Sequence, residues 1–249
     1  MEEVSENYWS VFGSYLANMF ELPGVRKVLD VGTGWGDCLI PLARRISPKG
    51  DIIGIDIDEA AVNETRSELN KQSLTNVRAE IMDATDLEFK NEVFDVITCG
   101  FIGFDQYYNF EENKFLKNHN NPLMKEIYRV LKHHGTFVLS SWKIQEDLEI
   151  AVEMAQKASE SPGFSNEHEE GIKFLMEDVG FTDIQIEVID YNRVYDSLDE
   201  WWKTNYLVSY YHIVRNLEND SYLKKFECDG KYYFKKSVIY AKGKKEISC

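Results

Sequence analysis

Three glycines directly after an apolar run constrain the fold of this chain more than any other feature. Residues 28–37 read VLDVGTGWGD, in which the apolar stretch at 28–31 predicts a buried strand. Gly32, Gly34 and Gly36 predict a turn that uses positive φ and that a ligand can approach closely, because no Cβ is present. A helix is expected from about Asp37, so the segment predicts a strand, turn and helix built around a ligand.

A second strand and an acid follow at the spacing of nucleoside-binding folds. Residues 52–58, IIGIDID, form a second apolar run that delivers Asp56. Asp56 comes about 20 residues after the glycines, where a carboxylate can accept hydrogen bonds from both ribose hydroxyls. The segment therefore predicts an α/β unit that binds a nucleoside.

The glycine spacing separates two kinds of cofactor. The dinucleotide fingerprint G-x-G-x-x-G needs a glycine at position 37, where a pyrophosphate rests on the helix N-terminus. Position 37 is Asp. A carboxylate there repels a pyrophosphate but tolerates a phosphate-free cofactor with a cationic centre. An NAD-dependent oxidoreductase is therefore a weaker alternative.

The pattern D-x-G-x-G-x-G formed by Asp30 and the three glycines resembles motif I of the class I S-adenosylmethionine (SAM) dependent methyltransferases. The resemblance implies that the glycine turn faces the methionine part of SAM. It also implies that Asp30 lies near the amino group and that Asp56 holds the ribose.

Further segments extend the resemblance over residues 25–145 and, loosely, 165–195. AEIMDATDLEF resembles the family's third strand, and the acid and amide that contact adenine in the family correspond to Asp83 and Ala84. FDVITCGFIGF resembles the fourth strand, and MKEIYRVLKHHGTFVLSSW the helix, glycine turn and fifth strand. The cofactor contacts implied are Asp30, Gly32, Thr33, Gly34, Gly36, Asp56, Ile57, Asp83, Ala84, Cys99, Gly100 and Tyr8.

The expected fold is α/β and Rossmann-like, with a seven-stranded, mostly parallel sheet, helices on both faces and an antiparallel last strand. Helices are expected near 37–46, 58–72, 121–132 and 146–160. Residues 1–24 would supply an N-terminal helix that covers the cofactor, 25–145 the SAM-binding core, and 146–249 the rest of the same domain. An aromatic helical insert at about 196–235 is predicted to cover the substrate as a lid.

Composition indicates a soluble, cytoplasmic protein. No apolar run approaches the roughly 18 residues of a membrane span, and the start MEEVSENYWS lacks the features of a secretory signal. The four cysteines form no C-x-x-C pair, which predicts free thiols in a reducing cytosol and neither a disulfide framework nor a zinc site. A monomer or homodimer is expected.

Charge argues against a nucleic acid partner. With 43 acidic and 28 basic residues, the net charge of −15 repels phosphate backbones. A local basic patch is offered only by the C-terminal KYYFKKSVIYAKGKK, which contains six lysines. We interpret this segment as an edge strand whose lysines prevent pairing with other chains.

Aromatic side chains are the expected substrate contacts. Ring faces stabilise a cationic sulfonium by about 0.5 to 2 kcal/mol each, and methyl transfer depends mainly on positioning. The predicted substrate contacts are Phe101, Phe104, Trp201, Trp202 and Tyr206.

A general base is harder to assign. Tyr107, Tyr108 and His119 follow the fourth strand and are the candidates, although methylation of an amine, thiol or stabilised carbanion needs no protein base. His133 and His134 are interpreted as residues at a helix C-terminus, opposite the cofactor side.

The sequence predicts a SAM-dependent methyltransferase with a small-molecule acceptor, similar to the broad group that includes the ubiquinone and menaquinone biosynthesis C-methyltransferases. CGFIGF stands where enzymes that methylate amino groups in polymers carry an asparagine-proline-proline-tyrosine type motif, so that activity is not expected. A catalytically silent SAM or S-adenosylhomocysteine (SAH) binding module is the alternative from another class.

Overall fold

The computed structural model describes residues 2–4, 8–46, 48–116, 121–156, 166–208 and 215–246, without the side chains of 155–156 and 206–208. The chain divides into two compact units. Unit 1 comprises Met1–Tyr8, Trp142–Asn166 and Val188–Val238, and unit 2 comprises Trp9–Ser141, Glu167–Glu187 and Ile239–Cys249. Strands β8, β9 and β11 pass from one unit into the other, and each unit is described by itself.

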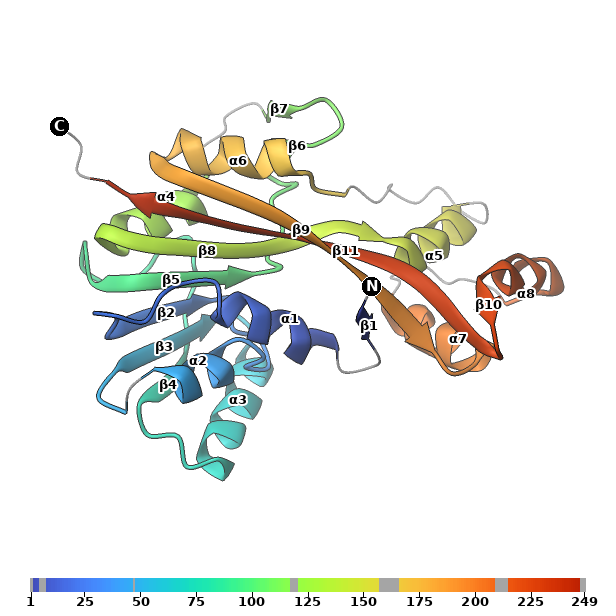
Figure 1. Cartoon of the computed structure of the whole chain (residues 1–249), viewed down its shortest axis with the longest axis horizontal. Coiled ribbons are helices and arrows are strands. Elements are labelled where there is room, and N and C mark those ends of the chain that lie inside the picture. The colour runs from blue at the N-terminus through green and yellow to red at the C-terminus, as the bar shows by residue number, and fades with distance from the viewer. Residues whose placement is uncertain are drawn as a thin grey trace. The chain divides into compact units, whose positions relative to one another are not determined.

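Unit 2 contains the mostly parallel sheet that the sequence predicts, in the strand order β9-β11-β8-β5-β2-β3-β4. Four pairs in it are parallel, and β11 runs opposite to β8 (Figure 1). The strands are β2 (Lys27–Val31), β3 (Asp51–Asp56), β4 (Val77–Ile81), β5 (Phe94–Gly100), β8 (Leu131–Gln145), β9 (Phe181–Tyr195) and β11 (Lys231–Lys245).

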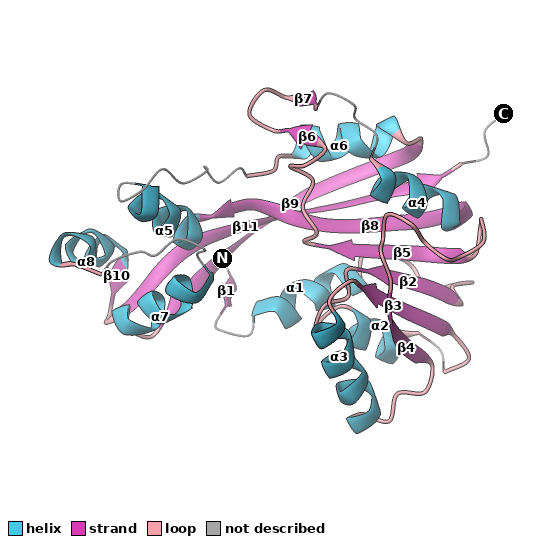
Figure 2. Ribbon diagram, turned by 180° about the vertical axis from the view of Figure 1, so that it is seen from behind, coloured by secondary structure: helices cyan, strands magenta, loops and turns pink. Residues whose placement is uncertain are grey.

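Helices cover both faces of this sheet, with α1 to α3 on one face and α4 and α6 on the other (Figures 1 and 2). Capping side chains fix where two of them begin. Asp58 accepts hydrogen bonds from the N–H groups of Ala60 and Ala61, and Asn121 precedes a proline at the first helical position. The helices are α1 (Tyr8–Ala17), α2 (Leu39–Arg45), α3 (Glu59–Lys71), α4 (Pro122–Val130) and α6 (Glu169–Asp178), and a small hairpin pairs β6 (Tyr108–Asn109) with β7 (Lys114–Phe115).

Unit 1 adds two short strands, which bring the sheet to nine strands over the described residues instead of the seven expected. β1 (Glu2–Val4) pairs in parallel with β9, and β10 (Glu227–Cys228) pairs antiparallel with β11. The helices of unit 1 are α5 (Glu146–Gln156), α7 (Leu198–Val208), α8 (Leu217–Leu223) and the 3-10 helix η1 (Lys224–Phe226).

The lysine-rich C-terminal segment is not an edge strand, and that interpretation was wrong. β11 lies between β9 and β8 in the sheet. Lys245 is 6% exposed and donates to the carbonyls of Tyr128 and Leu131. Lys236 is 2% exposed and pairs with Asp147. Both lysines therefore satisfy polar groups inside the protein rather than guard an edge.

The histidines after α4 also differ from expectation. The helix ends at Val130, and His133 and His134 belong to β8, where their rings lie beside Glu92 and Glu246. They do lie toward the amino end of the strand, as expected. Over the described residues, none of the helices is both long and apolar enough to cross a membrane.

Candidate functional site

The glycine turn after β2 has the backbone conformation that the sequence predicts. Gly32, Gly34 and Gly36 have φ angles of +70°, +49° and +87°, which glycine adopts readily. A Cβ at Gly34 would meet no heavy atom within 4 Å, whereas one at Gly36 would lie 3.2 Å from Thr65 on α3. Gly34 therefore faces open space, and Gly36 seats the turn on the helix.

Asp30 fixes this turn from within the sheet. Its carboxylate is buried and accepts hydrogen bonds from Thr33 Oγ1 at 2.7 Å and Thr98 Oγ1 at 2.6 Å. Burial raises the pKa of Asp30, and the two hydroxyl hydrogen bonds oppose that rise. Asp30, which the resemblance places near the amino group of the cofactor, therefore also stabilises the turn through its hydrogen bonds.

Asp56 ties the end of β3 to the same turn. Its Oδ2 accepts a hydrogen bond from the Gly34 N–H at 2.8 Å, and its Oδ1 accepts one from the Asp58 N–H at 2.9 Å. Each carboxylate oxygen has a further lone pair. Asp56 can therefore hold the turn and still accept hydrogen bonds from a ribose.

Two cavities of unit 2 meet at this turn and together form a cleft. Both are lined by Gly32, Gly100 and Phe101. Cavity A, of about 310 Å³, is further lined by Trp9, Gly13, Leu16, Asp30, Thr33, Gly34, Trp35, Asp37, Cys38 and Ser140. Cavity B, of about 430 Å³, is further lined by Ile55, Asp56, Ile57, Met82, Asp83, Ala84, Thr85, Ile102, Gln106, Tyr107 and Leu123.

The lining of the cleft is acidic. Asp30 and Asp37 line cavity A, Asp56 and Asp83 line cavity B, and no lysine or arginine is among the described residues that line either one. Burial raises the pKa of Asp37, while hydrogen bonds from Thr85 lower that of Asp83. A cationic ligand is therefore favoured over a pyrophosphate.

Phe101 lines both cavities and is held in a strained conformation. Its φ is +54°, which is rare for an aromatic residue. Its N–H donates to the Ser140 carbonyl at 2.9 Å, and its ring meets the Trp9 ring edge-on at 5.2 Å between centroids. This strain lies where a ligand crossing the cleft would pass.

A buried carboxyl supports the segment that follows β5. Glu167 is 6% exposed, its Oε1 accepts the Phe104 N–H at 2.6 Å, and its Oε2 accepts the Ser141 hydroxyl. Burial raises the pKa of Glu167 to about 7, against the opposing effect of these hydrogen bonds. Glu167 was not anticipated from the sequence, because its partners lie 63 and 26 residues away along the chain.

Most predicted cofactor residues line the cleft, but two lie behind it. Gly36 packs on α3, and Cys99 is buried in β5, where burial raises the pKa of its thiol. Among the other candidates, Tyr107 lines cavity B. Phe104 is buried, and its N–H donates to Glu167. The Tyr108 hydroxyl donates to Asn113 at 2.6 Å, away from the cavity linings.

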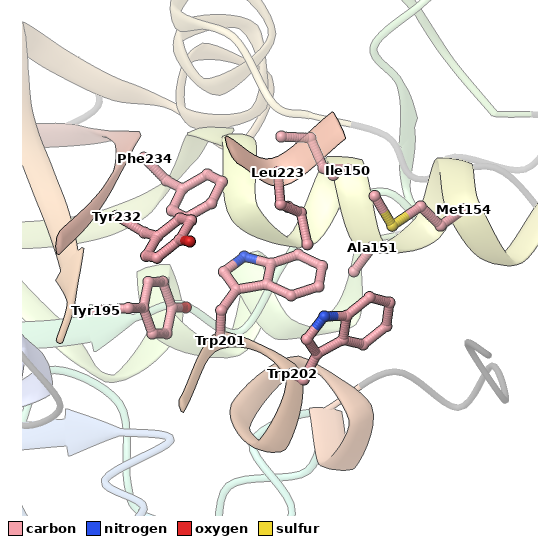
Figure 3. Packing of buried hydrophobic residues seen from close by; sticks show 9 residues of the cluster. All are labelled: Ile150, Ala151, Met154, Tyr195, Trp201, Trp202, Leu223, Tyr232 and Phe234. Atoms are coloured by element: carbon pink, nitrogen blue, oxygen red, sulfur yellow. The ribbon is translucent and has the colours of Figure 1, made fainter. Parts of the chain in front are cut away.

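The remaining predicted residues belong to unit 1 or fall outside the described chain. Trp201 and Trp202 are buried against α5 in a hydrophobic cluster (Figure 3). Tyr8 lies beside Trp142 in the same unit. Tyr206 belongs to α7, but its side chain is outside the described part, as is all of His119. Their contacts with cofactor or substrate remain predictions.

Several cleft residues were missed because they depend on packing between distant elements. A Cβ at Gly13 would lie 2.2 Å from the Asp37 carbonyl oxygen, so α1 packs directly on the glycine turn. Ser140 lies in the carboxyl half of β8, and its Oγ is buried with no hydrogen-bond partner. Position at a strand's carboxyl end could have identified Ser140, but no local pattern marks Gly13.

Comparison with known proteins gives one family and a set of partial relatives. A family described as a methyltransferase domain matches residues 25–204. The aklanonic acid methyltransferase DauC of Streptomyces sp. (strain C5) is 30% identical over 96 residues, which cover 39% of this chain and 44% of that protein. A demethylmenaquinone methyltransferase of Lactobacillus johnsonii is 31% identical over 108 residues, covering 43% of this chain and 40% of the relative. The chain thus spans less than half the length of these relatives.

Among solved structures, the YcgJ protein from Bacillus subtilis superposes with a TM-score of 0.63 at 16% identity, covering 98% of this chain and 100% of the other. At this identity the likeness shows the fold alone.

Proposed function

The chain belongs to the methyltransferase domain family, because that family matches most of its length, and from this we propose that it transfers a methyl group from SAM to a small-molecule acceptor. The observation that carries the proposal is the acidic cleft around a glycine turn, lined by no basic residue among those described. The acceptor class follows the relatives named above, which are methyltransferases of small molecules by name.

The residues of the cleft fit the cofactor. Ser140 offers a buried hydroxyl that has no partner, and Gly34 leaves open the space that a Cβ would fill. Asp30 and Asp37 would lie beside the methionine part, where carboxylates favour the amino group and sulfonium. Asp56 would hold the ribose, and Asp83 with Ala84 would contact the adenine.

SAM supplies an electrophilic methyl group on a positively charged sulfur. The contribution of this chain is to orient and shield it. Trp9 and Phe101 line cavity A with ring faces and edges that favour a cation and exclude water. Correct alignment of two reacting groups supplies most of the rate in such a transfer.

Proton removal from the acceptor is assigned to Tyr107 where the acceptor needs it. Tyr107 lines cavity B, and burial together with Asp83 raises the pKa of its hydroxyl. A raised pKa keeps this hydroxyl protonated near neutrality, so little of it is the tyrosinate that could take up a proton, and we favour an acceptor that ionises without help from the protein. We further propose that residues 196–235 cover the substrate, and that the protein acts in the cytoplasm as a monomer or homodimer without nucleic acid.

Thermal denaturation with added ligands tests this function. SAM and SAH are expected to raise the melting temperature, because both bind the folded form, and NAD is expected to leave it unchanged. Stabilisation by NAD alone would contradict the proposal. Binding of SAM without turnover on any metabolite of a broad panel would make the chain a SAM-binding module.

Gly34→Ala, with Gly24→Ala as its matched control, localises the effect. Both glycines have positive φ and open space around a Cβ, so both changes cost roughly 1 kcal/mol of backbone strain. Only Gly34 lines the cleft, so only Gly34→Ala should lose the SAM-dependent rise in melting temperature. Equal responses in the two variants would place the cofactor elsewhere.

A further inference from the structure

Unit 1 buries two cations beside one carboxylate. Arg193 on β9 and Lys236 on β11 are 1% and 2% exposed. Asp147 at the start of α5 accepts a hydrogen bond from Lys236 Nζ at 2.8 Å. It also accepts the Tyr195 hydroxyl at 2.6 Å and the Leu148 N–H at 2.9 Å, so its oxygens are engaged. The cluster therefore has one positive charge in excess.

The excess charge belongs to Arg193. Its Nη1 makes a long hydrogen bond of 3.3 Å to the Val194 carbonyl, and its buried Nε–H has no acceptor. Within the described ranges, no carboxylate forms an ion pair with it. The Tyr195 and Tyr8 rings lie 4.2 and 5.4 Å from the guanidinium carbon. Ring faces offset only part of the cost of burying an unpaired cation.

Two aromatic side chains form the partly exposed side of this cluster. Tyr8 and Trp142 meet edge-on with centroids 6.3 Å apart, and both are only partly buried. Lys236 Nζ lies 5.3 Å from the Tyr8 ring and 4.9 Å from the Trp142 ring. A ligand that reaches the buried cations must therefore pass or displace these rings.

We propose that this cluster is a binding site for the carboxylate of a small aromatic acid. The cluster consists of Arg193, Lys236, Asp147, Tyr8, Tyr195 and Trp142. A carboxylate is planar and accepts two parallel N–H bonds from a guanidinium, which would supply the acceptor that Nε lacks. The single negative charge of a carboxylate balances the single excess positive charge of the cluster. A doubly charged phosphate would bring more negative charge than the cluster can balance. An aromatic ring on the acid could pack against Tyr8 and Trp142.

The bound acid has two possible sources, the methyl acceptor or a separate ligand. Only the assignment to the methyl acceptor rests on the proposed function, and a methylation assay distinguishes the two sources.

Benzoate is the probe for the site. We expect it to raise the melting temperature of the full chain, and benzamide, which has the same ring but no charge, to leave it unchanged. Arg193→Met should abolish the benzoate response while keeping the shift caused by SAH. Arg215→Met removes a partly exposed arginine of the same unit and should keep both responses. Equal responses to benzoate and benzamide, or a full benzoate response in Arg193→Met, would overturn the proposal.

Crystals of the unmodified protein soaked in 4-bromobenzoate provide a test that does not depend on a variant folding. Anomalous signal from bromine is expected beside Arg193, and its absence there would contradict the site. Mass spectrometry after incubation with SAM and hydroxybenzoates then separates the two sources. A methylated acid identifies the acceptor, whereas binding without methylation identifies a separate ligand, and both outcomes uphold the site. SAH binding reports independently on the cleft.

Discussion

The cleft of unit 2 and the cation cluster of unit 1 have opposite charge balances. Four aspartates and no described basic residue line the cleft, whereas the cluster places Arg193 and Lys236 around the single carboxylate of Asp147. The cleft consists of two cavities, whereas aromatic rings lie against the buried cations of the cluster. Buried charge of each sign is costly unless a partner neutralises it. The difference indicates that one unit is prepared for a cation and the other for an anion.

Removal of Asp147 tests the cluster and carries the largest expected effect. Asp147→Asn would remove the carboxylate that pairs with Lys236, so that Lys236 as well as Arg193 would lack an ion pair, which we expect to lower the free energy of unfolding by about 3 to 5 kcal/mol. Urea denaturation at neutral pH measures the change. Adding Lys236→Met to this variant should recover most of the loss, because it removes one of the unpaired cations.

The matched control is Asp196→Asn in the same unit. Asp196 pairs with Lys231 at 2.7 Å, but both side chains are at least half exposed, so water screens the pair. Its unfolding curve should coincide with that of the unmodified protein. If Asp147→Asn behaved like this control, the excess buried charge would not exist and the contrast between the units would fail.

Local sequence patterns explain why the fold around the cleft was predictable. Residues 27–45 carry β2, the glycine turn and α2 in one contiguous segment, and the positive φ of Gly32, Gly34 and Gly36 is the conformation that glycine adopts readily. Asp56 and Asp83 both line cavity B, where each lies at or just after the carboxyl end of a strand, and their contacts with the cofactor remain predictions. Signals of this kind need no knowledge of distant partners.

Unit 1 and the supports of the cleft depend on partners far away in sequence. Lys245 is buried because it donates to the Leu131 carbonyl, 114 residues away along the chain. Lys236 is buried because it pairs with Asp147, 89 residues away. The lysine spacing alone therefore suggested an exposed edge strand. Trp201 packs in the buried cluster with residues of α5 and β11, and its predicted contact with substrate remains a prediction. No local pattern encodes such pairings.

A pH titration of stability would sharpen the picture of the cleft's support. Burial raises the pKa of Glu167 from its ordinary 4.5 to about 7, so the folded state holds this proton more tightly than the unfolded state. Stability from this group is therefore full below pH 4.5 and is lost as the pH rises toward 7. The loss amounts to about 3 kcal/mol.

Glu167→Gln isolates this contribution, because the other titrating groups are common to both proteins. Between pH 4.5 and 7.5, the unmodified protein should lose about 3 kcal/mol of unfolding free energy relative to Glu167→Gln. Parallel curves across this range would mean that the carboxyl ionises normally and that solvent reaches it.

Asp56→Asn, with Asp58→Asn as its control, carries the smallest effect and completes the comparison. The amide oxygen can still accept one backbone N–H of the turn, but it loses the charge that strengthens hydrogen bonds from the ribose, so SAM affinity should fall by about 1.5 to 3 kcal/mol. Asp58 caps α3 and does not line the cleft, and asparagine caps as well as aspartate, so its variant should bind SAM normally. Calorimetry with SAM measures both, and unchanged affinity in Asp56→Asn would remove this residue from the site. Because the cleft lining and the cation cluster have opposite charge, Asp56→Asn should leave the benzoate response intact, just as Arg193→Met should leave SAH binding intact.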